Sequence, residues 1–207
     1  MKKLLILSVV LLTMTLPLFA ADFSIGPKAV LGEYSYRGSD WKETKDSLAI
    51  KDKFSLSYGG GLMFNMGLTE MFSVQLDALY LFSTVRVGND SVWAQNNYSS
   101  VNLPLYARFD FPVGSVNLYL MGGPSFTILF DKYKTKDNNG NTTENTLSDD
   151  EKNFLIGISA GAGVAVPAGP GNLDIGAVYN TNFTKINPNN STYFQGFEFQ
   201  VGYGFKL

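Results

Sequence analysis

Long stretches of this sequence alternate residue by residue between apolar side chains and small or polar ones. The pattern is clearest near the C-terminus, where Phe197, Phe199 and Val201 share one parity and Glu198 and Gln200 share the other. Successive side chains of a β-strand point to opposite faces, so the pattern predicts a strand with one apolar face. Eight segments show it, over residues 23–36, 54–66, 72–82, 101–111, 116–130, 154–166, 173–184 and 193–207. We expect no amphipathic helix longer than a turn or two, and therefore an all-β fold.

The connections between these segments alternate between short and long. Three are tight and carry Gly or Pro, at 67–70, 112–115 and 167–171. Four are longer and polar, at 37–53, 87–97, 131–152 and 186–192. Consecutive turns of an up-and-down meander lie at opposite ends, so the short and long connections separate to two ends. The connections 37–53 and 131–152 hold 19 of the 34 charged side chains. We therefore expect the chain to contact water mainly at the end that carries the long connections.

The first 20 residues have the order of a secretory signal peptide. A basic start at Lys2 and Lys3 precedes an apolar run over 4–16, and small residues follow at Ala20 and Ala21. The alternative is a retained membrane anchor, but the run is short for a span of roughly 20 residues. We expect cleavage after Ala20 or one residue later, which leaves a single domain over 21–207.

Two kinds of barrel share this strand pattern, a soluble lipocalin-like barrel and a membrane barrel with the faces reversed. The smaller parity is rich in Gly, Ser and Ala, which suits the filled interior of an eight-stranded barrel. The strands carry too few Lys and Glu residues for a soluble exterior. The sequence therefore predicts an eight-stranded antiparallel up-and-down transmembrane β-barrel, and a soluble periplasmic lipocalin-like carrier remains the alternative.

Aromatic residues near the strand ends predict two girdles at the bilayer interfaces. The girdle expected at the tight-turn end contains Phe64, Phe72, Phe109, Phe111, Tyr203 and Phe205. The girdle expected at the long-loop end contains Tyr34, Tyr36, Trp93, Tyr98, Phe130 and Tyr193.

Closure and register follow from hydrogen-bonding requirements. No water in lipid satisfies a free strand edge, so we expect the first strand to pair with the last. Pro27, Pro104 and Pro124 fall inside predicted strands, and each removes one ladder donor. We expect bulges, or local donors that face the lumen, at these three positions, and the registers near them stay open.

The last eight residues resemble the C-terminal signal that the outer-membrane barrel assembly machinery recognises. The signal has a polar residue, a glycine two positions later, and then two hydrophobic residues separated by one. Gln200, Gly202, Phe205 and Leu207 fill these places, with Leu207 where the signal usually has an aromatic residue.

Two internal segments, 98–108 and 118–126, resemble mid-barrel segments of the outer membrane protein beta-barrel domain, or porin-like, family. The resemblance implies a small OmpA/OmpX-type barrel in the cell outer membrane. Its implied partners are outer membrane lipid and the barrel assembly machinery.

Composition excludes several other classes of function. The chain has no Cys and no His, so thiolate chemistry, imidazole catalysis and the usual zinc sites are absent. A net charge of −2 gives no basic footprint for nucleic acid. The acidic run Asp149–Glu151 lacks the spacing of an EF-hand and is assigned to a solvated loop. We expect no enzyme activity, no cofactor and no metal site.

Six charged residues fall on the inward parity: Lys28, Asp77, Arg108, Asp110, Asp174 and Glu198. They could form a proton path, a gate or a ligand site, but buried charges persist only when they are paired. Lys28 and Glu198 lie on strands that closure makes neighbours, and Asp77 and Arg108 also lie on neighbouring strands. The favoured interpretation is therefore a structural salt-bridge network in the lumen.

The expected role is membrane structure and surface interaction through the long loops, led by 131–152 and 37–53, with an extracellular ligand or a host surface as partner. The alternative is a narrow channel for small or hydrophobic solutes, as in OmpW-like barrels. Inward apolar residues give that alternative slight support, namely Met63, Leu79, Leu81 and Met121.

Overall fold

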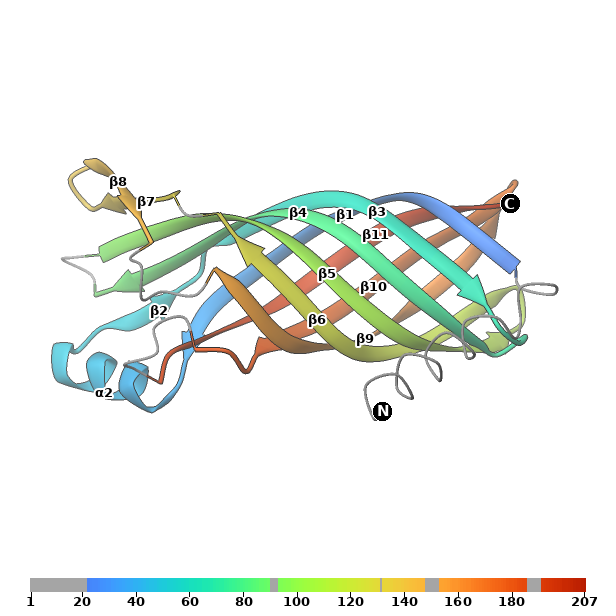
Figure 1. The fold of residues 1–207 in the computed structure, drawn as a ribbon, viewed down its shortest axis with the longest axis horizontal. Helices are drawn as coiled ribbons and strands as arrows, with labels where there is room; N and C mark the ends of the chain where they lie inside the picture. The colour runs from blue at the N-terminus through green and yellow to red at the C-terminus, as the bar shows by residue number, and fades with distance from the viewer. Residues whose placement is uncertain (1–21, 90–92, 131, 148–152, 186–190) are drawn as a thin grey trace, which may run out of the picture.

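The computed structural model describes residues 22–89, 93–130, 132–147, 153–185 and 191–207. The expected signal peptide and the acidic run Asp149–Glu151 lie outside the described residues. Eight long strands form the wall of a tube (Figure 1). They are β1 (Asp22–Arg37), β3 (Leu56–Gly67), β4 (Phe72–Gly88), β5 (Trp93–Val113), β6 (Val116–Leu129), β9 (Phe154–Ala168), β10 (Gly171–Asn182) and β11 (Tyr193–Lys206).

The eight long strands close into a ring. Each pairs antiparallel with the next along the chain, and β1 pairs with β11 from Ser24 opposite Lys206 to Arg37 opposite Tyr193. Closure leaves no free edge along the wall, as a membrane barrel requires. The predicted eight-stranded up-and-down barrel is confirmed.

Three short strands and one helix extend the long connections. They are α2 (Ser39–Leu48), β2 (Lys51–Lys53), β7 (Lys132–Asp137) and β8 (Thr142–Thr146). The expectation of no helix longer than a turn or two is wrong, since the 10 residues of α2 make about three turns. None of its side chains is buried, so the sequence has no apolar stripe to reveal it. No helix in the described ranges is long and apolar enough to cross a membrane.

The two faces of the wall differ as the alternation predicts. The outward side chains of Leu118, Phe197 and Phe199 are 48%, 58% and 49% exposed, whereas the inward Asp174 and Glu198 are 8% and 0% exposed. The apolar face therefore surrounds the tube and the polar face fills it, which is the arrangement of a membrane barrel.

The predicted aromatic girdle is correct near the tight turns and wrong in part near the long loops. Near the tight turns, Phe64, Phe109, Phe111 and Phe205 point outward and are exposed. Near the long loops the prediction for Tyr34, Tyr36 and Tyr98 is wrong. Tyr36 and Tyr98 are buried inside the barrel, and the Tyr34 hydroxyl donates to the lumen residue Glu198. These tyrosines have the same parity as the inward residues. The alternation along the strand therefore decides which way they point, although they lie near the interface.

Phe130 keeps its predicted place in an outward belt at the long-loop end, and aromatic residues outside the prediction complete that belt. These exposed rings are Tyr58, Tyr80, Phe82, Phe130, Phe154 and Phe183. The rings of Tyr58 and Phe82 lie 5.2 Å apart, and those of Tyr80 and Phe130 lie 5.8 Å apart.

The three prolines do not produce the expected bulges. The β1–β11 register is the same on both sides of Pro27, and the β5–β6 register is the same on both sides of Pro104. Pro124 stays opposite Ile158 in an unbroken β6–β9 register. The ladders lose individual pairs beside Pro27 and Pro104 without a shift, because one missing donor does not require an extra residue.

Candidate functional site

The lumen near the tight turns is occupied by an ionic cluster around Arg108. Its guanidinium donates to Asp110 and Asp174, each at 2.9 Å, and to the Gln75 amide oxygen at 3.0 Å. The same guanidinium lies 4.0 Å from the centre of the Tyr119 ring. Asp174 belongs to β10, three strands around the ring from β5, so this contact crosses the lumen.

A second buried ion pair lies further along the tube. The Lys28 ammonium donates to Asp77 at 2.6 Å, and the Gln75 amide donates to the other oxygen of Asp77 at 2.9 Å. Lys28 also reaches the Gln200 amide oxygen at 3.3 Å. Lys28, Asp77 and Arg108 are all buried.

Glu198 is fully buried and is held by neutral groups. It accepts hydrogen bonds from the Tyr34 hydroxyl and, at 2.7 Å, from the Gln200 amide. Lys28 and Glu198 lie on paired strands, as the sequence predicts, but Gln200 lies between them. Gln75 links Asp77 and Arg108 in the same way, so two amide side chains join what would otherwise be separate ion pairs.

We call this connected set the lumen network. It runs without interruption through Tyr34, Glu198, Gln200, Lys28, Asp77, Gln75, Arg108, Asp110 and Asp174. It joins five of the eight wall strands. The sequence located all six charged members but missed the bridging roles of Gln75, Gln200 and Tyr34. Their inward parity was the available signal, because a buried amide or hydroxyl beside buried charges has to be hydrogen-bonded.

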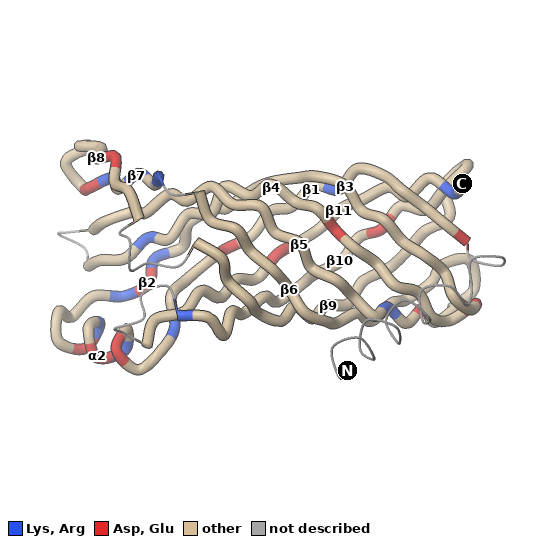
Figure 2. Tube along the Cα trace, viewed as in Figure 1, with Lys and Arg blue, Asp and Glu red and all other residues tan. Residues whose placement is uncertain are grey.

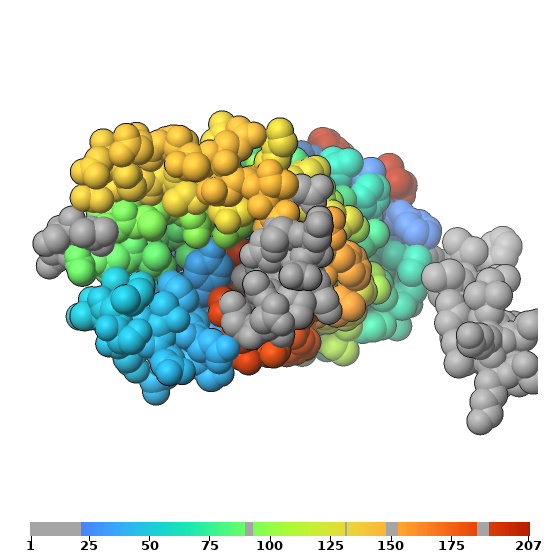
Figure 3. Space-filling view, turned by 60° about the vertical axis from the view of Figure 1, so that its left-hand side comes forward, coloured from blue at the N-terminus to red at the C-terminus, as the bar shows by residue number. Residues whose placement is uncertain are grey.

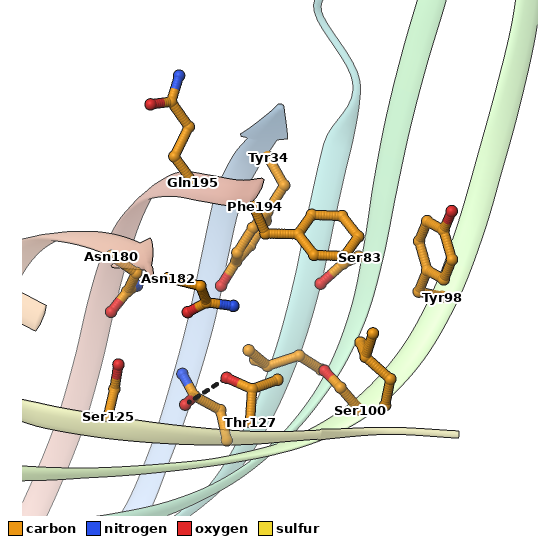
Figure 4. A pocket seen from close by; sticks show the side chains of 13 residues that line it. Tyr34, Ser83, Tyr98, Ser100, Ser125, Thr127, Asn180, Asn182, Phe194 and Gln195 are labelled. Atoms are coloured by element: carbon orange, nitrogen blue, oxygen red, sulfur yellow. Dashed lines mark hydrogen bonds between the residues drawn. The ribbon is translucent and has the colours of Figure 1, made fainter. Parts of the chain in front are cut away.

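A narrow cavity lies beyond Tyr34 on the long-loop side (Figure 4). Its volume is about 30 Å³, and its lining includes the uncharged hydroxyl and amide side chains of Ser83, Ser100, Ser125, Thr127, Asn102, Asn180 and Asn182. The Thr127 hydroxyl donates to the Asn102 amide oxygen at 3.2 Å. A cavity of this size has room for about two water molecules, which the Ser, Thr and Asn side chains can hydrogen-bond.

The cavity is roofed by an aromatic cap, which we define as Tyr36, Tyr98 and Phe194. The hydroxyls of Tyr36 and Tyr98 are 2.7 Å apart, and the Phe194 ring lies 5.2 Å from Tyr36 and 5.3 Å from Tyr98. Trp41 of α2 meets the Tyr36 ring edge-on at 5.1 Å, and Tyr133 of β7 stacks on Tyr98 at 5.0 Å. The cap thus connects the barrel to both structured loops.

A polar vestibule opens at the tight-turn end. Its volume is about 260 Å³, and its lining includes Arg108, Asp110 and Asp174 together with residues of the strand ends. The vestibule therefore ends against the lumen network, and the aromatic cap lies in the lumen toward the opposite end.

The comparisons with known proteins agree with this architecture. The sequence profile of the outer membrane protein beta-barrel domain matches residues 6–205. The chain belongs to this family. No curated protein matches its sequence.

Two solved barrels have a similar fold. Neisserial surface protein A is 15% identical with a TM-score of 0.56, and the alignment covers 91% of this chain and 99% of that one. The outer membrane protein OprG from Pseudomonas aeruginosa is 13% identical with a TM-score of 0.56, covering 91% of this chain and 96% of that one. At these identities the likeness concerns the fold. This family member is thus an integral outer membrane barrel in contact with lipid, and a soluble periplasmic carrier is excluded.

In barrels of this kind the short turns are periplasmic and the long loops extracellular. Charged residues gather at the extracellular end around α2, β2, β7 and β8 (Figure 2). Space-filling atoms of α2 and of the β7–β8 hairpin form two lobes on either side of the β4–β5 ribbon (Figure 3).

Two loop carboxylates are held by hydrogen bonds. The backbone N–H of Ser191 donates to Asp40 at 2.9 Å, which lowers the pKa of the Asp40 carboxyl. The side-chain amide of Asn141 and the backbone N–H groups of Asn139 and Asn141 donate to Asp137, which lowers its pKa as well. These hydrogen bonds hold the first turn of α2 against Ser191 and stabilise the turn of the β7–β8 hairpin.

The four residues of the C-terminal pattern lie at the periplasmic half of β11 or directly after it. Gln200 and Gly202 face the lumen and are buried, whereas Phe205 and Leu207 are exposed. Within the described residues no group of three or more acidic, His or Cys side chains is arranged to hold a metal ion.

Proposed function

We propose that this protein is a closed, non-conducting barrel that presents an extracellular surface for interaction with a ligand or a host surface. The observation that carries the proposal is that buried side chains fill the lumen at two levels, those of the lumen network and those of the aromatic cap. A buried ionic network with every charge held by a partner stabilises one arrangement of the wall and leaves no open path.

The extracellular lobes support the surface role. The Trp41 indole N–H of α2 donates to Asp52 at 3.2 Å, and Lys45 of α2 forms an ion pair with Asp52 at 2.6 Å. The β7–β8 hairpin continues the sheet through β5, from Ala94 opposite Asp137 to Asn97 opposite Lys134. Loops held in this way present a defined surface, which reduces the entropic cost of binding.

Cell adhesion tests the surface role. Cells that display the full chain are compared with cells that display a variant in which residues 39–48 and 132–146 are replaced by short Gly-Ser linkers. We expect the variant to insert normally, with the heat-modifiable gel migration of a folded barrel, and to lose attachment to host cells. Equal attachment by both chains would contradict the surface role.

Planar-bilayer recordings test the closure. We expect no single-channel steps from the folded wild-type chain. The neutral polar cavity favours a second candidate function, passage of small uncharged solutes. Steps in the wild type, or uptake of a small polyol into liposomes, would favour that candidate over the closed barrel.

We further propose that Gln200, Gly202, Phe205 and Leu207 are the signal for the barrel assembly machinery, and that the barrel carries no catalytic activity. Exposure of Phe205 and Leu207 at the strand end supports the first point. Slower membrane insertion of Phe205→Ser than of Phe199→Ser would test it, since both substitutions remove an outward phenyl ring from β11.

A further inference from the structure

At the extracellular end, β2 pairs with β4, β7 pairs with β5, and β8 pairs with β7. These strands extend the wall beyond the barrel, and we call them the extracellular extension. Positive charge gathers on one face of this extension. Six cations of β2, β4 and β7 share the outward face of this extension: Lys51, Lys53, Arg86, Lys132, Lys134 and Lys136. We call it the basic face. From these positions we propose that the basic face binds the phosphate groups of lipids in the outer leaflet around the barrel.

The orientation of β7 is fixed by its inward side chains. The Thr135 hydroxyl donates to the Asn96 amide oxygen at 2.8 Å, and Asn96 in turn donates to Tyr36 of the aromatic cap at 3.2 Å. Tyr133 stacks on Tyr98 of the same cap. Since side chains alternate along a strand, Lys132, Lys134 and Lys136 point to the opposite, outward side. All three are exposed.

Strand register places the cations in rows across the extension. Arg86 pairs with Lys53 on one side and with Gln95 on the other, and Gln95 pairs with Lys136. In the row below, Thr84 pairs with Asn97, and Asn97 pairs with Lys134. Below that row Phe82 pairs with Tyr58 and with Ser99.

The lowest of these rows belongs to the lipid-facing belt. Tyr58 and Phe82 are outward and exposed, in the position where barrels have their interfacial aromatic residues. Rows two residues apart along a strand are about 7 Å apart, so Lys134 lies one step and Arg86 two steps beyond the aromatic belt. The headgroup region of each leaflet is roughly 5–8 Å thick, which is the level of the lower cations.

The surface between the belt and the cations is concave. A groove of about 630 Å³ is lined by Tyr58, Phe82, Thr84, Asn97 and Lys134, among others. On the outward rows of the described extension Glu144 is the only carboxylate, and it lies 3.4 Å from Lys132. An acyl chain on the aromatic belt and a phosphate against the cations would satisfy both parts of the groove at once.

A soluble polyanion is the other occupant that a basic surface could attract. Continuity with the lipid-facing belt favours a membrane lipid, because the groove joins the cations to aromatic rings that already contact acyl chains. The Arg86 guanidinium also lies 3.9 Å from the Trp93 ring on this face, which holds the cation at the surface of the extension.

The test uses the folded full chain in nanodiscs of phosphatidylcholine with a minor fraction of phosphatidic acid, whose headgroup is a phosphate monoester. Lipid adducts retained on the protein are counted by native mass spectrometry. We expect several-fold enrichment of phosphatidic acid on the wild type and loss of that enrichment in the double variant Lys134→Gln, Lys136→Gln.

The matched control is Lys42→Gln, Lys206→Gln, which removes the same charge from α2 and from the periplasmic end of β11. Heat-modifiable gel migration verifies that both variants are folded. The proposal is overturned if the two double variants retain phosphatidic acid equally. It is also overturned if the wild type binds dextran sulfate from solution, in a manner that depends on Lys134 and Lys136, without enriching phosphatidic acid.

Discussion

Charges close the lumen at one level and aromatic rings close it at another. Every buried charge of the lumen network needs a partner, so a single substitution leaves another charge buried and unpaired. The aromatic cap depends on packing and on one hydroxyl pair, so its members are replaceable by groups of similar shape. The lumen network therefore requires particular charged residues, whereas the aromatic cap requires only side chains of similar shape and volume.

Removing the central cation should have the largest effect. Arg108→Ala leaves the buried Asp174 and the partly buried Asp110 without their cation and should destabilise the barrel by about 3–5 kcal/mol in urea unfolding from lipid vesicles. The control is Arg86→Ala, whose guanidinium lies over Trp93 outside the lumen and should cost roughly 1 kcal/mol or less. Similar losses of unfolding free energy in the two variants would show that the lumen network stabilises the barrel no more than a surface cation does.

A charge on the outward side of the wall should cost somewhat less. Phe199 lies between the lumen residues Glu198 and Gln200 in sequence, yet it faces lipid. Phe199→Arg should cost about 2–4 kcal/mol in the same assay if it meets the bilayer core. Phe199→Leu keeps an apolar side chain and should cost about 1.5 kcal/mol or less. An arginine tolerated as well as the leucine would place Phe199 away from acyl chains.

A conservative change in the aromatic cap should have a small effect. Tyr98→Phe removes the hydroxyl that meets Tyr36 at 2.7 Å but keeps the ring. We expect a loss of about 1 kcal/mol, against no change for Tyr58→Phe on the outward belt. A loss as large as that of Arg108→Ala would mean that polar contacts dominate the cap as well.

Acidification should loosen the β7–β8 turn beyond the cap. The pKa of Asp137 is lower in the folded hairpin than in an unfolded chain. Its hydrogen bonds therefore stabilise the turn fully above the ordinary carboxyl pKa, and this stabilisation is lost as the pH falls through the lowered value. The protection factors of the Asn139 and Asn141 amides against hydrogen exchange should fall at acidic pH in the wild type, and not in Asp137→Ala. Unchanged protection of both amides at low pH in the wild type would contradict the role given to Asp137.

Alternation along the chain was sufficient to predict eight strands, the two ends of the barrel and the face on which each side chain lies. Tyr36 and Tyr98 illustrate how far that local rule extends: their parity assigns them to the lumen, although their position near the interface suggests a girdle. The helix α2 was not predictable from periodicity, because none of its side chains is fully buried and it has no apolar stripe.

The partners of each side chain were decided only by the closed tube. Lys28 lies on a strand next to that of Glu198, yet it binds Asp77, and Arg108 reaches Asp174 across the interior. The alternation of side chains along a strand depends only on neighbouring residues, so the sequence alone determines whether a side chain faces the lumen or the lipid. Contacts across a barrel depend on how strands are staggered around the ring, which is set only when the first strand pairs with the last.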